Sequence, residues 1–372
     1  MKKRVVIAGL GDTGLLVALD LHPEFDVVGI TPKPCLVSGQ ELGARLARPD
    51  AWRRNYLMPF ARYRRLAGMP VVQGLITHVD TDRRHVAVRH IDGEERRVPF
   101  DVLVIASGVA NGFWRNAALE DIGAINGRID RDAEQIARAR SVAVLGGGTS
   151  GVSVASNLKE QYPRTDVHLF VSRTQPLPGY HPRVRVAVEA ALAKQGVVVH
   201  AGHRAVLPDG FHGERLTTDP VEWTTGQAPF QADVTLWAVG QKRPNSGFLP
   251  PTMLDAEGYV LVDEHLRVPG FTNVFAVGDI AASDPNRSSA RNAGFRTVAH
   301  NVRCHLTGRE PRMRSFRATP YRWGSIFGVQ RDGMRVFTPQ GRSVRIRPWW
   351  VEHVLFPWVV ERMIYKGIAS PP

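Results

Sequence analysis

The sequence predicts an α/β fold in which two three-layer domains are built around parallel sheets. Two apolar runs, Val5–Ala8 and Val142–Leu145, each lead into a turn with the spacing Gly-x-Gly-x-x-Gly, first at Gly9 and again at Gly146. A strand, a glycine turn and a helix in this order open a Rossmann-like βαβ unit. Because the second unit begins in the middle of the chain, we expect its domain to be inserted into the first.

The first domain is predicted to have elements on both sides of the insertion. Its early strands and helix are expected at 4–8, 13–21, 25–30, 71–73, 74–79, 85–90 and 96–99. The apolar segment 100–108 predicts a strand buried on both faces, as in parallel sheets. A later strand, within 266–280, ends in Gly278-Asp279, where a carboxylate can accept hydrogen bonds from ligand hydroxyls.

The inserted domain repeats this pattern. Its βαβ unit is expected at 141–170, with a helix at 150–162 and a strand at 167–171, and the apolar strand 234–240 closes it. The expected divisions are therefore 1–110 and 241–308 for the first domain, 111–240 for the inserted domain, and 309–372 for a C-terminal α+β segment.

The two glycine turns point to two bound dinucleotides. The first glycine permits the tight turn, the second lets the backbone approach a pyrophosphate, and the third packs helix against strand. The N-terminus of the helix faces the diphosphate. Two such sites in one chain indicate a flavin and a nicotinamide that exchange a hydride.

Five motifs in order resemble those of the two-dinucleotide flavoprotein oxidoreductases, the pyridine nucleotide-disulfide oxidoreductase superfamily. They are the two glycine turns, 106–108, 237–240 and 275–279. Segment 323–333 is similar to one in the branch of type II NADH:quinone oxidoreductases and the apoptosis-inducing-factor-like, ferroptosis-suppressor quinone reductases. The resemblance implies FAD in the first site, NADH or NADPH in the second, and two electrons passed to a quinone-like acceptor.

The expected FAD-binding residues combine the first turn with the family motifs. They are Gly9, Gly11, Asp12, Thr13, Gly14, Thr31, Lys33, Arg45, Ser107, Gly108, Gly278, Asp279 and Asn292. The family usually has an acid at the end of the second strand, so Thr31, Lys33 or the backbone must replace it here. Arg45 could bind the pyrophosphate in a bidentate way or belong to a solvated helix face. Asp279 could bind a ribityl chain, cap the next helix, or do both.

The expected NAD(P)H-binding residues are Gly146, Gly148, Thr149, Ser150, Gly151, Arg173 and Gly240. The family often has a glutamate where this chain has Ser153. Ser172-Arg173 replaces the acid that would select a free 2′-hydroxyl. An arginine attracts a 2′-phosphate, so the sequence favours NADPH over NADH, although a solvated loop charge is the alternative.

The two cysteines, Cys35 and Cys304, form no C-x-x-C pair, so the dithiol of disulfide reductases is absent. Cys35 follows the second predicted strand, where some flavoenzymes of this build keep one reactive cysteine; a packing role is the alternative. We expect no certain catalytic side chain, because the flavin N5 carries the hydride. The histidines show no metal-ligand spacing, and no metal is expected.

Positive charge and aromatic residues are concentrated near the C-terminus. The net charge is +13, and nine arginines but one acid lie between Arg312 and Arg347. Three tryptophans follow within 349–358, a composition typical of segments at a lipid interface. We expect 312–368 to bind an anionic membrane surface, with a helix pair on the flavin domain or a homodimer interface as the alternative. No leader or spanning segment is recognisable, so the expected location is cytoplasmic, peripheral on the inner face of the membrane, without a specific nucleic-acid partner.

The sequence thus predicts an FAD-dependent NAD(P)H:quinone oxidoreductase. Three alternatives stay open. They are an NAD(P)H-dependent reductase of a small iron-sulfur carrier, a peroxide or persulfide reductase that uses Cys35, and a non-catalytic flavin fold that binds lipid or nucleic acid.

Overall fold

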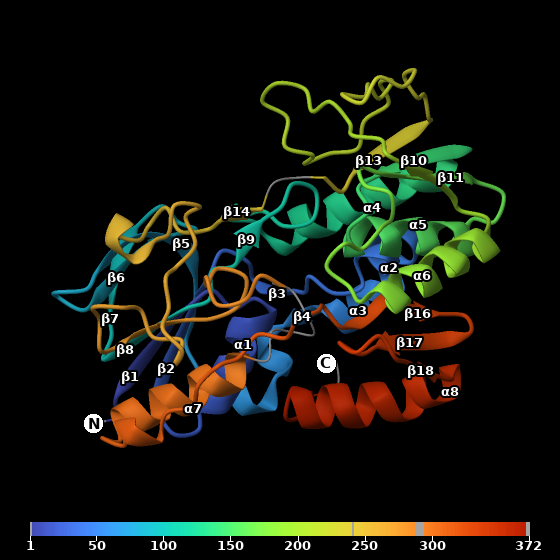
Figure 1. Ribbon diagram of the computed structural model, residues 1–372. Coiled ribbons are helices and arrows are strands. Elements are labelled where there is room, and N and C mark those ends of the chain that lie inside the picture. The colour runs from blue at the N-terminus through green and yellow to red at the C-terminus, as the bar shows by residue number, and fades with distance from the viewer. Residues whose placement is uncertain (1, 240–241, 287–293, 370–372) are drawn as a thin grey trace.

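A seven-stranded sheet forms the core of the first lobe in the computed structural model, which describes residues 2–239, 242–286 and 294–369 (Figure 1). In spatial order its strands are β15 (Val274–Ala276), β8 (Val102–Ile105), β1 (Arg4–Ala8), β2 (Asp26–Thr31), β5 (Val71–Asp80), β6 (His85–His90) and β7 (Glu95–Pro99). The strands from β15 to β5 are parallel, and β5 to β7 are antiparallel. Helices α1 (Asp12–Leu21) and α7 (Gly294–Leu306) contact each other beside this sheet.

A four-stranded parallel sheet forms the core of the second lobe. Its strands, in order, are β12 (Val198–Ala201), β11 (Asp166–Val171), β10 (Ser141–Leu145) and β13 (Val234–Trp237). The lobe also contains α4 (Ile122–Arg138), α5 (Thr149–Gln161) and α6 (Pro182–Gln195). Side chains of β10, α5 and α6, among them Val144, Leu158 and Leu192, are completely buried in one apolar core.

The order of strands changes direction beside the first strand of each sheet. The chain passes from β1 to its neighbour β2, and later adds β8 on the other side of β1. In the same way, β10 is followed by β11 on one side and by β13 on the other. In open α/β sheets, ligands bind at the carboxyl ends of the strands at such a change of direction.

The chain leaves the first lobe and returns to it at one place. Here β9 (Val109–Ala110) pairs antiparallel with β14 (Arg243–Pro244). The predicted α/β class, with two Rossmann-like units of which one interrupts the other, is confirmed. The residue boundaries of the domains stay a prediction.

Two predicted strands are shorter in the structure. Segment 266–280 contributes only β15 to the sheet. The chain turns back at Pro269 and Gly270, and the φ of Gly270 is +83°. Arg267 therefore forms an antiparallel bridge to Phe275 instead of continuing the strand. The last strand of the inserted domain ends at Trp237. In contrast, 71–73 and 74–79 form one strand, β5, with an irregularity in register between Ile76 and His78.

The C-terminal segment is α+β, as expected. It contains the antiparallel strands β16 (Gly324–Gln330), β17 (Gly333–Phe337) and β18 (Ser343–Ile346), then α8 (Pro348–Trp350), which continues as the π-helix Val351–Ile364. Strand β16 contacts α5, and the helix lies along one edge of the molecule (Figure 1). The remaining elements are β3 (Cys35–Val37), β4 (Leu57–Pro59), α2 (Leu42–Ala47), α3 (Pro49–Tyr56) and the short 3₁₀ turns Phe60–Arg62, Arg64–Leu66, Pro251–Met253 and Glu310–Arg312.

Candidate functional site

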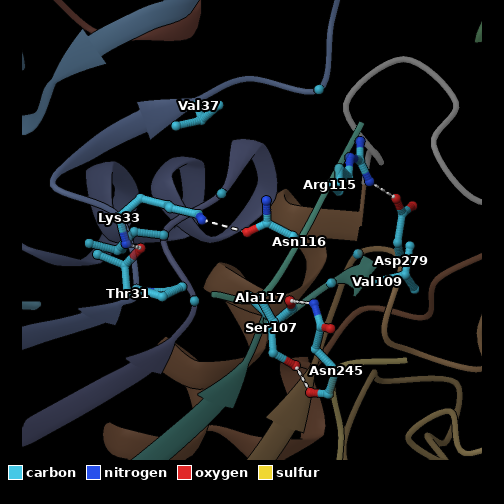
Figure 2. Close-up of a pocket in the computed structure, with 18 of the residues that line it drawn as sticks. Thr31, Lys33, Val37, Ser107, Val109, Arg115, Asn116, Ala117, Asn245 and Asp279 are labelled. Carbon is cyan, nitrogen blue, oxygen red and sulfur yellow. Dashed lines mark hydrogen bonds and ion pairs between the residues drawn. The ribbon is translucent and has the colours of Figure 1, made fainter. Parts of the chain in front are cut away.

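A cleft of about 540 Å³ opens at the carboxyl ends of β1, β2 and β8, where the topology places a ligand. Its walls come from the turns after these strands and from Gly278 and Asp279, which follow β15. The crossover at Asn245 and the segment 111–121, which we call the strap, complete it. Figure 2 shows Arg115 of the strap and Asp279 pointing toward each other across the cleft.

The glycines of the first turn have different roles. Gly9 has φ +108°, and a Cβ on it would lie 2.5 Å from the Ala106 carbonyl oxygen. A Cβ on Gly14 would lie 1.9 Å from the Gly9 carbonyl oxygen. A Cβ on Gly11, the N-cap of α1, would meet no atom within 4 Å. Gly9 and Gly14 are therefore required by the fold, whereas Gly11 leaves open space in front of the helix N-terminus.

The second turn has the same construction. Gly146 has φ +118°, and a Cβ on it would lie 2.5 Å from the Ala238 carbonyl oxygen. A Cβ on Gly151 would lie 1.9 Å from the Gly146 carbonyl oxygen, and one on Gly148, the N-cap of α5, would meet no atom within 4 Å. Both lobes thus offer an open helix N-terminus to an anionic group. We call each glycine turn with its helix N-terminus a cradle, and the two cradles fit the diphosphates of FAD and NAD(P)H. Thr149 and Ser150 lie in the first turn of α5.

The turn after β15 lies against the first turn of α1. A Cβ on Gly278, which has φ +86°, would lie 3.2 Å from Thr13 Oγ1. The structure therefore brings Asp279 and the first glycine turn into the wall of one cleft. Asp12 also lines this cleft, and its carboxylate accepts hydrogen bonds from Ser38 Oγ at 2.6 Å and from the Gly39 amide at 2.8 Å, so it anchors the loop before α2.

Sequence reasoning missed Arg115. Its Nη1 donates to Asp279 Oδ2 at 2.6 Å, and the Asp279 side chain is only 10% exposed. Arg115 belongs to no motif, but it follows two aromatic residues shortly after a strand that ends at the ligand crevice. That context was the available signal.

The end of β2 holds a second missed residue, Glu120. Lys33 and Arg128 both form ion pairs with its carboxylate. Lys33 Nζ also donates to Asn116 Oδ1 at 2.7 Å (Figure 2). It donates to the Ala118 carbonyl oxygen at 2.7 Å as well. Burial raises the pKa of Glu120, but its bonds to Arg128 and Lys33 outweigh this and leave the pKa below its ordinary value. The carboxylate at this end of β2 is thus that of Glu120 in the strap, and Lys33 anchors the strap through its bonds to Glu120, Asn116 and Ala118.

Thr31 and Ser107 are both in the cleft wall. Thr31 is 5% exposed, and its Oγ1 accepts a hydrogen bond from the Lys33 amide at 3.3 Å. Ser107 Oγ donates to the Asn245 carbonyl oxygen at 2.7 Å, and Asn245 Nδ2 donates back to the Ser107 carbonyl oxygen at 2.9 Å (Figure 2). Gly108 has φ +66° and open space at its Cβ position. The Ser107 hydroxyl therefore holds the crossover between the lobes.

Arg45 lies behind the cleft wall instead of in it. Its side chain is buried, Nη1 donates to the Trp114 carbonyl oxygen at 3.3 Å, and the guanidinium lies 5.6 Å from the centre of the Trp52 ring. Burial lowers its pKa to about 10, so it stays charged at neutral pH. It supports the strap from behind, which corrects both roles considered for it from the sequence.

Cys35 lies in β3, is 4% exposed and contributes to the cleft wall. Burial raises the pKa of its thiol to about 11, against a weaker opposite effect of Lys33. Cys304 is also buried, in α7. Because the thiolate is the reactive form, this environment suits a packing residue at neutral pH.

We expect the variant Cys35→Ser, Cys304→Ser to reduce its flavin with NAD(P)H at nearly the parent rate. Alkylation of Cys35 in the parent protein should be slow near neutrality and accelerate as the pH rises toward its pKa of about 11. Stopped-flow absorbance and mass spectrometry measure the two effects. A rate loss of about a hundredfold, which is typical for removal of a catalytic group, would support a catalytic Cys35.

Arg173 lies at the carboxyl end of β11, in the second lobe, and its side chain is exposed. Its carbonyl oxygen accepts a hydrogen bond from the Gly202 amide at 3.1 Å. The position suits contact with the ribose of a nucleotide bound at α5. Gly240 and Asn292, two further predicted ligands, lie outside the described residues.

Helix α2 follows the loop that Asp12 anchors and packs against α5 of the second lobe. A Cβ on its Gly43 would lie 2.4 Å from the Ser153 carbonyl oxygen of α5. Ser153 is 5% exposed under this contact, which explains why a glutamate is absent from its position. Arg48 donates to Glu160 Oε2 at 2.8 Å and to Asn157 Oδ1 at 2.6 Å, so α5 is bonded to the segment that follows α2.

No group of three or more His, Cys, Asp and Glu side chains within the described ranges is arranged to hold a metal ion. None of the helices described here is both long and apolar enough to span a membrane.

A family model and several curated proteins match this chain. A family model described as pyridine nucleotide-disulphide oxidoreductase matches residues 3–300. Apoptosis-inducing factor homolog B of Dictyostelium discoideum is 27% identical, over 79% of this chain and 78% of its own length. Ferroptosis suppressor protein 1 of Xenopus tropicalis is 26% identical, over 64% of this chain and 64% of its own length.

Solved structures show the same fold. The ferredoxin reductase for the CYP199A2 system from Rhodopseudomonas palustris has a TM-score of 0.66 at 19% identity, covering 86% of this chain and 79% of that protein. An NAD-dependent persulfide reductase from A. fulgidus has a TM-score of 0.65 at 19% identity, covering 90% of this chain and 63% of that one.

Proposed function

Because the chain belongs to the pyridine nucleotide-disulphide oxidoreductase family, whose members use FAD and NAD(P)H, we propose that it is an NAD(P)H:quinone oxidoreductase. FAD, when bound, supplies a centre that accepts a hydride and returns two electrons. The observation that carries the redox function is the pair of glycine cradles of equal construction, one in each lobe. No side chain has to form a covalent bond, because residues of the two lobes need only bind and orient the nucleotides.

Each lobe contributes binding and orientation. The N-termini of α1 and α5 stabilise the two diphosphates, and Asp279 offers a carboxylate to hydroxyls of the flavin side chain. The loop before α2 is bonded to Asp12 of α1, and Gly43 of α2 closely contacts α5, so this segment connects the two lobes. The second lobe can therefore present a nicotinamide to the cleft of the first without a change in fold.

Quinone as the acceptor has two supports. The sequence relatives include apoptosis-inducing factor and ferroptosis suppressor homologues, the branch that the sequence motifs resemble. The buried Cys35, with its raised pKa, disfavours thiol chemistry. The similarity to a ferredoxin reductase and to a persulfide reductase concerns the fold.

Steady-state oxidation of NADH and NADPH with different acceptors tests the proposal. We expect rapid oxidation with a short-chain quinone and slow oxidation with an iron-sulfur protein, a peroxide or a persulfide. Rapid oxidation only with an iron-sulfur protein would replace quinone by that class of carrier.

A surface at the C-terminal end supports contact with a lipid membrane. Its apolar side chains are exposed to between 53% and 71%; they are Val344, Trp349, Trp350, Trp358 and Met363. Exposed Arg342, Arg345, Arg347 and Arg362 lie among them in the sequence, and the Arg362 guanidinium lies 4.7 Å from the centre of the Trp358 ring. Tryptophan beside arginine suits the interface of an anionic bilayer. We call this set the Trp-Arg surface.

The opposite side of the same helix packs on the first lobe. Val360 and Ile364 contact its core, and the Tyr365 ring lies 5.2 Å from the Tyr63 ring. The sequence alternatives of lipid contact and a helix covering the flavin domain are therefore compatible. Point substitutions, rather than truncation, are the appropriate test.

We expect the parent protein to bind vesicles that contain an anionic lipid and to bind them less in about 1 M salt, where charges are screened beyond about 3 Å. Replacing Trp349, Trp350 and Trp358 by Ser should abolish binding and slow turnover with a long-chain quinone in vesicles, but not with a short-chain one. Ile91→Ser with Val186→Ser, which are 58% and 60% exposed elsewhere, is the control. Equal sedimentation of all three proteins with vesicles would contradict the lipid contact.

Arg173 supports a preference for NADPH. Its replacement by Asp should lower kcat/KM for NADPH relative to NADH by about 10- to 100-fold, because a carboxylate repels the 2′-phosphate that the guanidinium would bind. Arg164→Asp makes the same change just before the amino end of β11 and should leave the ratio unaltered. An unchanged ratio in the Arg173 variant would remove this basis for NADPH selection.

A further inference from the structure

The strap crosses the cleft and is fixed on both sides. At the β2 side, the Glu120 amide donates to the Pro32 carbonyl oxygen at 3.3 Å, and Gln73 Nε2 donates to the Glu120 carbonyl oxygen at 3.0 Å. At the β15 side, Arg115 forms the ion pair with Asp279. The strap therefore lies over the cleft that contains the first glycine turn.

Three cationic side chains line the described part of the cleft, namely Lys33, Arg115 and Arg128. Lys33 and Arg128 both pair with Glu120 at the β2 side of the cleft, so one carboxylate there meets two positive charges. Arg115 differs, because its partner Asp279 is itself a residue at the glycine turn. The Arg115 side chain is 29% exposed, while Asp279 is 10% exposed.

Two carboxylates, those of Asp279 and Asp12, lie near the Arg115 guanidinium. Burial acts to lower the pKa of Arg115, but the charges of Asp279 and Asp12 outweigh it and raise the pKa. Gly39 leaves room for the guanidinium, since a Cβ there would lie 2.1 Å from Arg115 Nη2. The charged Arg115 guanidinium is thus held close to Asp12, the first residue of α1. The diphosphate of FAD is expected at this end of the helix.

We propose that Arg115 binds the FAD diphosphate and that the strap is a clasp which retains the cofactor. A diphosphate placed beside Asp12 and Asp279 without a cation would meet two like charges, and the helix N-terminus offers only a partial positive charge. The guanidinium supplies a full charge and a planar fork that suits phosphate oxygens. Strap contacts at β2 then have to open before FAD can leave. The proposal is independent of which acceptor the enzyme reduces.

The test measures FAD affinity and release, not turnover. FAD is removed from the purified protein with concentrated bromide and titrated back, and its fluorescence gives the dissociation constant and the release rate. Arg115→Gln should weaken FAD binding by about 10- to 100-fold, as expected for loss of a charge-assisted hydrogen bond, and speed its release. Arg115→Lys should lose less, because it keeps the charge but not the fork. Arg138→Gln, on α4 with a side chain 81% exposed, is the control.

A double-mutant cycle separates diphosphate binding from a structural ion pair with Asp279. If Arg115 binds the diphosphate, Arg115→Gln weakens FAD binding in the Asp279→Asn protein as well. A loss that appears only when Asp279 is intact, or an unchanged affinity, would overturn the proposal. Should the Gln variant not fold, the Lys variant decides, because full affinity and unaltered release in that protein would also overturn it.

Discussion

Replacing Gly11 by valine is expected to give a folded protein that does not retain FAD. The added side chain points into open space, since a Cβ at Gly11 meets no atom within 4 Å, and the backbone φ of −72° is accessible to valine. The new methyl groups, however, occupy the space through which a diphosphate reaches the N-terminus of α1. Visible absorbance of the purified protein gives the flavin content, and circular dichroism reports folding.

Gly14→Val is the matched control. A Cβ there would lie 1.9 Å from the Gly9 carbonyl oxygen, so this variant should be destabilised or fail to fold. The two neighbouring glycines therefore separate loss of the cofactor from loss of the fold. Full flavin content in a Gly11→Val protein would show that FAD does not use this cradle.

Gly148→Val is expected to produce the complementary defect, a protein with full FAD that NAD(P)H cannot reduce. Gly148 is the N-cap of α5 with open space at its Cβ position, so the fold should tolerate the change. The nicotinamide would be excluded or displaced, and a displacement of about 1 Å can cost about a hundredfold in rate. Stopped-flow absorbance after mixing with NADPH under anaerobic conditions measures the rate.

Reduction of this variant by dithionite is the control, since dithionite needs no nucleotide site. It should reduce parent and variant alike. If NADPH reduces the Gly148→Val protein as fast as the parent, the second turn does not bind the nicotinamide dinucleotide.

Local sequence was sufficient for the fold and for the two cradles. A strand, a glycine turn and a helix are adjacent in the chain, so spacing alone indicates both Rossmann-like units. The roles of Gly11 and Gly14 follow from the same local geometry, whereas Gly9 is also constrained by the carbonyl of the distant Ala106. The early break in 266–280 was also visible as Pro269-Gly270, although the apolar run around it suggested a longer strand.

Contacts between distant segments were not predictable in this way. Glu120 meets Lys33 across 87 residues, and Arg115 meets Asp279 across 164 residues. Asp279 belongs to a motif, but no periodicity or motif marks its pairing with Arg115 or that of Glu120 with Lys33, because these contacts arise when the strap folds over the cleft. Arg45 was misplaced for a related reason: its burial depends on α3 and the strap, which supply Trp52 and the Trp114 carbonyl.

The central claim is that two electrons pass from NAD(P)H through FAD to a quinone. Anaerobic mixing of the purified protein with one equivalent of NADPH, followed by a short-chain quinone, tests it within one turnover. The expected result is stoichiometric bleaching of the flavin absorbance and its full return when quinone is added. A flavin that NADPH and NADH both fail to bleach, or a bleached flavin that quinone fails to reoxidise, would contradict the claim.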